Sequence, residues 1–194
     1  MQIVKYLNST KHRGIILNPD SSRGVETFAD ADWCGNWDKT EAEIDESTAK
    51  SRSGYVILFM GCIIMAASKL QTLCTLSTTE AEYVALSEAL RETIPIMNLL
   101  DEINKECEGA YVSKSCVRCK AFEDNSGALE LALVPKIRPR TRHINNKYHH
   151  FRSAVRTGRI SVSSVDTEEQ IADIFTKPLN QNSFLYLRKK LLGW

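Results

Sequence analysis

The order of extended and helical segments after residue 24 is the feature that most limits the fold. Residues 25–34, 53–60 and 62–70 are rich in β-branched and aromatic residues and predict three consecutive strands. A long helix is expected from about Thr78 to Asn104. It is followed by a strand over 116–124, a helix that stops before Pro135, helical character over 144–156 and a last strand over 159–165. This order predicts an α/β or α+β domain, in which a mixed sheet has helices packed on its faces.

Two capping patterns predict where helices begin. Ser77 and Glu80 are spaced as a capping box, so the long helix should start near Thr78. Thr167 and Gln170 have the same spacing and predict a short helix that Pro178 ends.

Length and composition favour one globular domain. The chain has 194 residues, of which 43% are hydrophobic and 25% charged, which is enough to bury one core. Residues 2–17 predict a short helix and an extended segment, and the turn-rich stretch 18–24 suggests that a new unit begins there. Because no signal peptide and no long apolar run is present, we expect a soluble intracellular protein with no membrane partner.

Basic residues are concentrated in one part of a nearly neutral chain. The formal net charge is only +1, yet no Asp or Glu occurs between Glu130 and Asp166. Such a segment is either a solvated face or a surface that attracts a phosphate backbone. Its cationic residues are Lys136, Arg138, Arg140, Arg142, Lys147, Arg152, Arg156 and Arg159.

Acidic residues in four separate motifs are the candidates for a metal site. Asp30 lies in FADADWCG on the first expected strand, where it shares a face with Asp32 and Phe28. Two acids on a face that points toward the core are costly unless a cation neutralises them. The alternative is that one or both lie at the strand end in solvent.

The long helix offers a choice between two acids. Glu80 and Glu82 point to different sides of the helix, so they cannot serve one site together. Glu80 is already explained as a capping residue, whereas Glu82 lies on the shoulder of a face of small apolar residues. Glu82 is therefore the candidate ligand, and an amphipathic edge position is its alternative role.

The remaining two acids follow later elements. Asp124 closes a strand at the kind of strand end where open-sheet sites gather, although Asp also favours helix caps. Asp173 lies inside a short expected helix, where Asp is a poor helix former and needs a reason to occur. Carboxylates from several rigid elements are the ligands that Mg²⁺ prefers.

The motifs FADADWCG, STTEAEYVALSEA, EDNSGAL, TRHINNKYHHFR and DTEEQIADIFTKPL occur in this order. Together they closely resemble the ribonuclease H domain at the end of copia-type (Pseudoviridae) retrotransposon polyproteins. The resemblance covers residues 24–194, and residues 1–23 look like the connecting segment that follows the reverse transcriptase in those polyproteins.

The resemblance implies a ribonuclease H fold with a five-stranded mixed sheet flanked by helices. It also implies that Asp30, Glu82, Asp124 and Asp173 bind two Mg²⁺ or Mn²⁺ ions, with Asp32 as a possible accessory residue. The expected reaction is endonucleolytic cleavage of the RNA strand of an RNA/DNA hybrid in a cytoplasmic retrotransposon particle, with the reverse transcriptase domain of the same polyprotein as partner. The expected nucleic-acid-binding residues are Asn125, Ser126, Arg138, Arg140, Arg142, His143 and Lys147.

One departure from the family pattern keeps other functions open. Cellular ribonucleases H place a histidine in a loop before the last acid, and no His lies between Phe151 and Asp173 in this chain. The alternatives are a catalytically weak module that binds hybrid or supports the reverse transcriptase, and another two-metal nuclease of the same superfold, such as an integrase or a resolvase.

Overall fold

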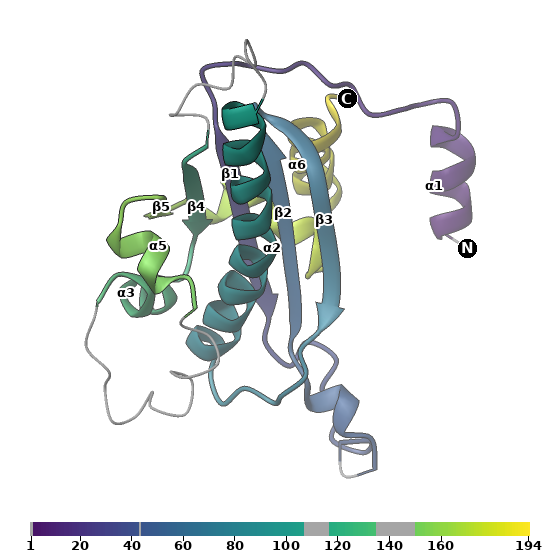
Figure 1. The fold of residues 1–194 in the computed structure, drawn as a ribbon. Coiled ribbons are helices and arrows are strands. Elements are labelled where there is room, and N and C mark those ends of the chain that lie inside the picture. Colours follow the sequence, from purple (N-terminus) through teal and green to yellow (C-terminus); the bar gives the residue numbers. More distant parts are fainter. Residues whose placement is uncertain (1, 43, 107–116, 135–149) are drawn as a thin grey trace.

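A computed structural model describes residues 2–42, 44–106, 117–134 and 150–194. The described part is built on a five-stranded sheet with the strand order β3-β2-β1-β4-β5 (Figure 1). The strands are β1 (Val25–Asp32), β2 (Arg52–Phe59), β3 (Cys62–Leu70), β4 (Cys119–Glu123) and β5 (Ile160–Ser164). β1, β2 and β3 form an antiparallel meander, and β4 and β5 run parallel to β1 and to each other. The predicted mixed sheet is confirmed.

Helices cover both faces of this sheet. α2 (Thr78–Glu106), α3 (Ser126–Leu133) and α5 (Arg152–Arg156) share one core with the strands, and this core contains the fully buried Tyr83 and Phe151. The 3₁₀ segment η4 (Ile171–Phe175) and helix α6 (Gln181–Leu192) pack on the opposite face, around Val56 and Leu187. Figure 1 shows α2 and α6 on opposite sides of the strands.

The segment before β1 is held to the end of α6. Helix α1 (Gln2–Thr10) projects from the rest of the chain in Figure 1, with the Tyr6 ring 5.7 Å from the ring of Phe184. The Ile16 amide donates to the Leu192 carbonyl, and the Trp194 indole donates to the Gly14 carbonyl at 2.7 Å. The division of the chain at residue 24 stays a prediction.

One of the two predicted capping patterns is confirmed. Ser77 Oγ accepts from the Glu80 amide at 3.2 Å, while the Glu80 carboxylate accepts from the Leu76 amide, one residue earlier than in a standard box. α2 continues through Pro95 to Glu106. The last part of the helix predicted over 144–156 is present as α5, and residues 144–149 lie outside the described residues.

The second capping box is wrong. Residues 167–175 form two short 3₁₀ segments, η3 (Thr167–Glu169) and η4, instead of one helix. Gln170 separates them because its side chain is fully buried and donates to the Ala29 carbonyl of β1 at 2.9 Å. The same side chain accepts from the Ala172 amide at 3.4 Å, so Gln170 caps the start of η4 and ties this segment to the sheet.

Gly54 of β2 allows η4 to pack closely against the sheet. A Cβ atom there would lie 2.6 Å from Thr176 Cγ2 and 2.8 Å from Phe175 Cβ. Gly54 also faces Asp30 across the β1–β2 pair. We expect Gly54→Ala to push η4 from the sheet and to lower the free energy of unfolding by about 1–3 kcal/mol, the usual cost of overpacking. Urea denaturation measures this, with Gly14→Ala as control because nothing lies within 4 Å of the Gly14 position. Equal stability of the two variants would contradict the close packing.

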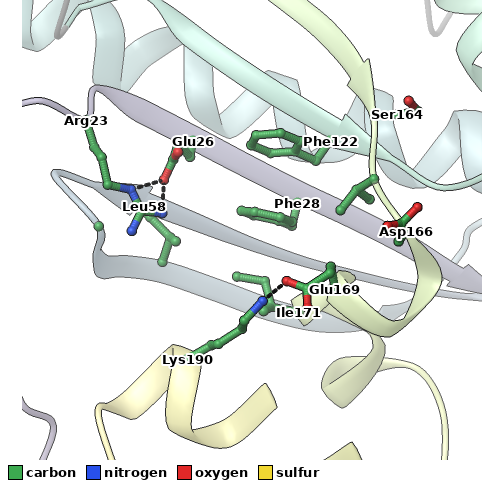
Figure 2. Close-up of a pocket in the computed structure, with 12 residues that line it drawn as sticks. Arg23, Glu26, Phe28, Leu58, Phe122, Ser164, Asp166, Glu169, Ile171 and Lys190 are labelled. Atoms are coloured by element: carbon green, nitrogen blue, oxygen red, sulfur yellow. Dashed lines mark hydrogen bonds and ion pairs between the residues drawn. The ribbon is translucent and has the colours of Figure 1, made fainter. Parts of the chain in front are cut away.

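A cavity of about 650 Å³ lies on the α6 side of the sheet (Figure 2). The rings of Phe28 and Phe122 stack along it at 4.5 Å between centroids. Four of its charged side chains form ion pairs, Arg23 with Glu26 and Lys190 with Glu169. The carboxylates of Glu26 and Glu169 are thus neutralised within the protein.

Candidate metal centre

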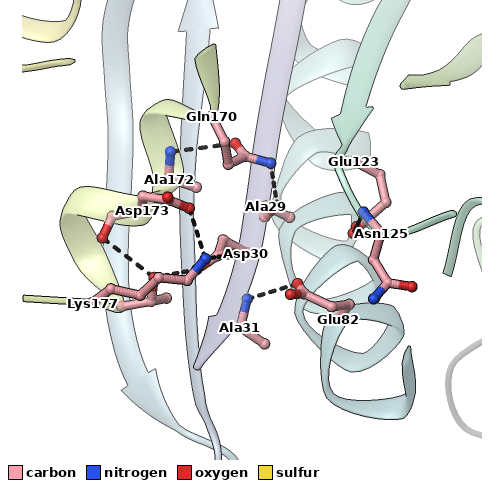
Figure 3. Close-up of polar contacts among 11 residues, drawn as sticks. Ala29, Asp30, Ala31, Glu82, Glu123, Asn125, Gln170, Ala172, Asp173 and Lys177 are labelled. Atoms are coloured by element: carbon pink, nitrogen blue, oxygen red, sulfur yellow. Dashed lines mark hydrogen bonds and ion pairs between the residues drawn. The ribbon is translucent and has the colours of Figure 1, made fainter. Parts of the chain in front are cut away.

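The centre forms where β1 and β4 stop pairing. Their parallel ladder ends at Phe28 and Phe122, while β1 continues to Asp32. The backbone of β1 beyond this point needs other partners, because buried amide and carbonyl groups are rarely left unpaired. Glu82 of α2 accepts from the Ala31 amide at 2.7 Å, and Gln170 donates to the Ala29 carbonyl. Side chains from both faces of the sheet thus enter the gap (Figure 3).

All four predicted ligands meet at this gap. Asp30, Asp124 and Asp173 each offer a carboxylate oxygen, and these three atoms lie within 4.8 Å of one another. A second group with the same spacing consists of Glu82, Glu123 and Asp124. Asp124 belongs to both groups, so the two candidate ion positions share one residue. Asp30 is fully buried, and Glu82 and Asp173 are nearly so.

Lys177 provides a positive charge at the first group. Its Nζ lies 3.0 Å from Asp30 Oδ1 and 3.2 Å from Asp173 Oδ1. The Thr176 hydroxyl also donates to Asp30. The ammonium therefore bridges two carboxylates that η4 and β1 bring together, as Figure 3 shows.

Burial and mutual repulsion raise the pKa values of these acids. Burial raises the pKa of Glu82 to about 10, with Asp30, Glu123 and Asp124 adding repulsion. Burial and the charge of Asp30 raise the pKa of Asp173 to about 7, against the attraction of Lys177. Burial alone would lower the pKa of Lys177, but Asp30 and Asp173 outweigh it and raise this pKa above its usual value. Acids with such pKa values are poised to exchange a proton for a metal ion.

The raised pKa of Asp173 predicts a pH-dependent stability of the metal-free protein. Between about pH 4 and 7 the folded chain keeps a proton on Asp173 that the unfolded chain has lost, so stability falls as the pH rises through this window. We expect the Tm in EDTA to fall more steeply from pH 5 to pH 8 in the wild type than in Asp173→Asn. The difference between the two thermal denaturation series isolates the Asp173 contribution, and parallel series would show that its pKa is not raised.

The residues present fit a hard divalent cation. Every candidate ligand atom is a carboxylate oxygen, which suits Mg²⁺ or Mn²⁺ better than a softer metal. Glu123 Oε2 is buried without a hydrogen-bond partner among the described residues. Glu82, Asp124 and Lys177 also line a cavity of about 410 Å³, through which solvent or a phosphate group can approach.

Three further predicted site residues, Asp32, Asn125 and Ser126, lie at or beside the cavity that leads to the four acids. Asp32 lines the same cavity, but its carboxylate turns back over Gly35, where a Cβ atom would lie 1.7 Å from Asp32 Oδ2. Asn125 also lines the cavity and caps α3 by accepting from the Ala128 amide, and Ser126 is exposed beside it. The predicted residues Arg138, Arg140, Arg142, His143 and Lys147 lie outside the described residues.

Two arginines of the basic stretch have structural partners. Arg159 donates to Asp101 at 2.9 Å and to Asn98 at 3.0 Å, both on α2. Arg152 donates to the Leu131 carbonyl at 2.9 Å. These contacts hold α2, α3, α5 and β5 together, so a nucleic-acid role for the basic stretch depends on its other cations.

Sequence reasoning missed three residues of the centre. Glu123 precedes Asp124, and its signal was an acid at the end of a buried strand. Lys177 follows Asp173 by four residues, a spacing that predicts an ion pair on a helix. Gln170 had no usable signal, because its partner is a carbonyl 141 residues earlier in the chain.

Known proteins are similar to this chain in sequence and in fold. No family model matches the chain. Over 190 residues it is 31% identical to the Retrovirus-related Pol polyprotein from transposon RE1 of Arabidopsis thaliana, and over 191 residues it is 32% identical to that from transposon TNT 1-94 of Nicotiana tabacum. Each alignment covers 98% of this chain, but only 12% and 13% of the two polyproteins.

Solved structures of ribonuclease H domains are similar to this chain in fold. The N-terminal RNase H domain of Rv2228c from Mycobacterium tuberculosis has a TM-score of 0.50 and 14% identity, over 86% of this chain and 97% of that one. LC11-RNase H1 also has a TM-score of 0.50 and 14% identity, over 79% of this chain and 93% of that one. The five-stranded mixed sheet, the two helical layers and these structural matches define a domain with the ribonuclease H fold.

Over 98% of its length the chain is homologous to part of the copia-type retrotransposon Pol polyproteins, which confirms the resemblance seen in its motifs. It spans about an eighth of the length of these relatives. None of the helices in the described ranges is both long enough and apolar enough to cross a membrane.

Proposed function

We propose that this domain hydrolyses the RNA strand of RNA/DNA hybrids with two divalent metal ions, Mg²⁺ or Mn²⁺. The proposal depends on one observation. Two sets of three acidic residues, which share Asp124, lie at the point where the parallel strands β1 and β4 stop pairing. Bound divalent ions would supply a Lewis acid for the phosphate and lower the pKa of an attacking water.

The side chains of the domain then have separate tasks. Asp30 and Asp173 would hold a cation on the η4 side, Glu82 would hold one on the α2 side, and Asp124 would contribute to both. Glu82 also accepts from the Ala31 amide near the end of β1, and this contact positions its carboxylate before any substrate binds. Preorganised ligands of this kind need little rearrangement during the reaction.

Selection of the hybrid would depend on its shape and on its 2′-hydroxyl groups. Asn125 and Ser126 lie beside the cavity that leads to the centre and are the proposed contacts to the wide minor groove. Cations of the segment that contains Arg138, Arg140, Arg142, His143 and Lys147 are proposed to hold the phosphate backbone. The reverse transcriptase of the same polyprotein is the proposed partner, and residues 1–23 are the proposed connection to it inside a cytoplasmic particle.

A substrate panel tests this function. The purified chain is incubated with an RNA/DNA hybrid, duplex RNA, duplex DNA and branched DNA, in Mg²⁺ or Mn²⁺. We expect cleavage of only the RNA strand of the hybrid, giving 5′-phosphate and 3′-hydroxyl ends and stopping in EDTA. Cleavage of branched or duplex DNA would identify another nuclease of the same fold. An intact hybrid that still binds the chain would identify a binding module.

A further inference from the structure

Glu123, the last residue of β4, has the surroundings of a metal ligand. Its side chain is fully buried. Oε1 accepts from the Asn125 amide at 3.2 Å, whereas Oε2 has no hydrogen-bond partner in the described part of the protein. An unpaired buried carboxylate oxygen costs free energy unless a cation or a proton neutralises it. The structure therefore leaves a defined position for a positive charge at Oε2.

The neighbours of Glu123 indicate a cation at this position. Glu82 projects from α2 on the same side of the sheet, and Asp124 follows directly along the chain. Oxygens of all three acids lie within 4.8 Å of one another. Figure 3 shows Glu123 and Glu82 reaching the gap from β4 and α2, two different elements. A cation between them would be held by rigid secondary structure on both sides.

Strand geometry separates this group from the Asp30 and Asp173 group. Side chains alternate along β4, so Glu123 lies on the α2 side with Cys119 and Ala121, which belong to the core beneath that helix. The Lys177 ammonium contacts Asp30 and Asp173 on the other side. The described residues provide no such ammonium contact for Glu82 or Glu123. Lys177 attracts Glu82 and Glu123 only from a greater distance, so the negative charge of this second group is less compensated by direct contacts.

The charge of the whole centre favours two ions. Ionised Asp30, Glu82, Glu123, Asp124 and Asp173, together with the Lys177 ammonium, carry a formal charge of about −4, which two divalent cations neutralise.

We propose that Glu123 is a fifth carboxylate of the centre and ligates, with Glu82 and Asp124, the divalent cation on the α2 side of the sheet. This inference rests on the proposed metal-dependent function. It assigns the two ion positions to different ligands: Asp30 and Asp173 on one side, Glu82 and Glu123 on the other, with Asp124 between them.

Mn²⁺ titration of the metal-free chain by calorimetry tests the assignment. The wild type should bind two Mn²⁺ ions. Glu123→Gln keeps the size of the side chain and an oxygen for the Asn125 amide, so it should fold normally while its affinity for one of the two ions falls at least tenfold. Glu26→Gln is the matched control, because Glu26 is a nearly buried glutamate of the same sheet that pairs with Arg23 instead.

The outcomes separate the two proposals. If Glu123→Gln binds both ions as tightly as the wild type, Glu123 is not a metal ligand. That result would indicate that a proton neutralises Oε2 of Glu123. A wild type that binds no Mn²⁺ overturns the proposed function itself. If Glu123→Gln does not fold, Glu123→Asp retains the charge on a shorter side chain. A wild-type crystal soaked in Mn²⁺ must then show an ion in contact with Glu82, Glu123 and Asp124, and an ion held without Glu123 overturns the inference.

Discussion

Asp124→Asn is expected to abolish cleavage of an RNA/DNA hybrid, lowering the rate by about a thousandfold or more. Asp124 belongs to both sets of three acidic residues, so its loss removes a ligand from both proposed ion positions at once. Effects of about this size follow when a preorganised electrostatic group is removed from an active site. Glu123→Gln and Asp173→Asn each affect one group and should leave more activity.

The measurement is single-turnover cleavage of a labelled hybrid in saturating Mn²⁺. Asp166→Asn is the control for the same chemical change, because Asp166 is exposed and its side chain caps no helix. Binding of the uncleaved hybrid should persist in Asp124→Asn, since the replaced charge repels phosphate. A variant that cleaves at a rate within tenfold of the wild type would rule out a shared ligand at Asp124.

Lys177→Met should strongly destabilise the metal-free protein. Its ammonium neutralises Asp30, which is fully buried, and removing one partner of a buried ion pair leaves an uncompensated charge. The Thr176 hydroxyl still donates to Asp30, so we expect a loss of about 2–4 kcal/mol, at the low end for such pairs. This corresponds to a fall in Tm of about 4–16 °C for a domain of this size.

Metal should reverse the effect of Lys177→Met. A divalent ion at Asp30 and Asp173 takes over the neutralising role of the ammonium and no longer competes with it, so the variant should bind Mn²⁺ more tightly than the wild type. Thermal denaturation in EDTA and in Mn²⁺ measures both changes. Lys190→Met is the control, because Lys190 pairs with Glu169 outside the centre. An unchanged Tm in EDTA would show that Lys177 does not stabilise the carboxylates.

The sequence predicted the elements of the fold because their signals are local. Runs of β-branched and aromatic residues located the first strands, and Ser77 located the start of α2 within one residue. The 3₁₀ segments at 167–175 were not predictable in this way. Gln170, between the two segments, bonds to the Ala29 carbonyl of β1, and a capping pattern contains no information on such a distant partner.

The residues of the centre also differ in whether their sequence signals were local. Asp30, Glu82, Asp124 and Asp173 each had a local signal, and the structure brings all four to one gap. Glu123 and Lys177 had only weak signals, because their importance arises from burial and from charges on other elements. What local patterns could not predict was the balance of charge in the assembled site.

The contact between Trp194 and the segment before β1 affects how this domain can be separated from a longer polyprotein. The indole lies under the guanidinium groups of Arg13 and Arg188, at 4.6 and 4.0 Å from its ring, and donates to the Gly14 carbonyl. A fragment that starts at residue 24 would lose Arg13 and Gly14 and expose this tryptophan to solvent. A fragment that keeps these contacts should therefore begin upstream of Arg13, because the residues before β1 pack against Trp194 and the end of α6.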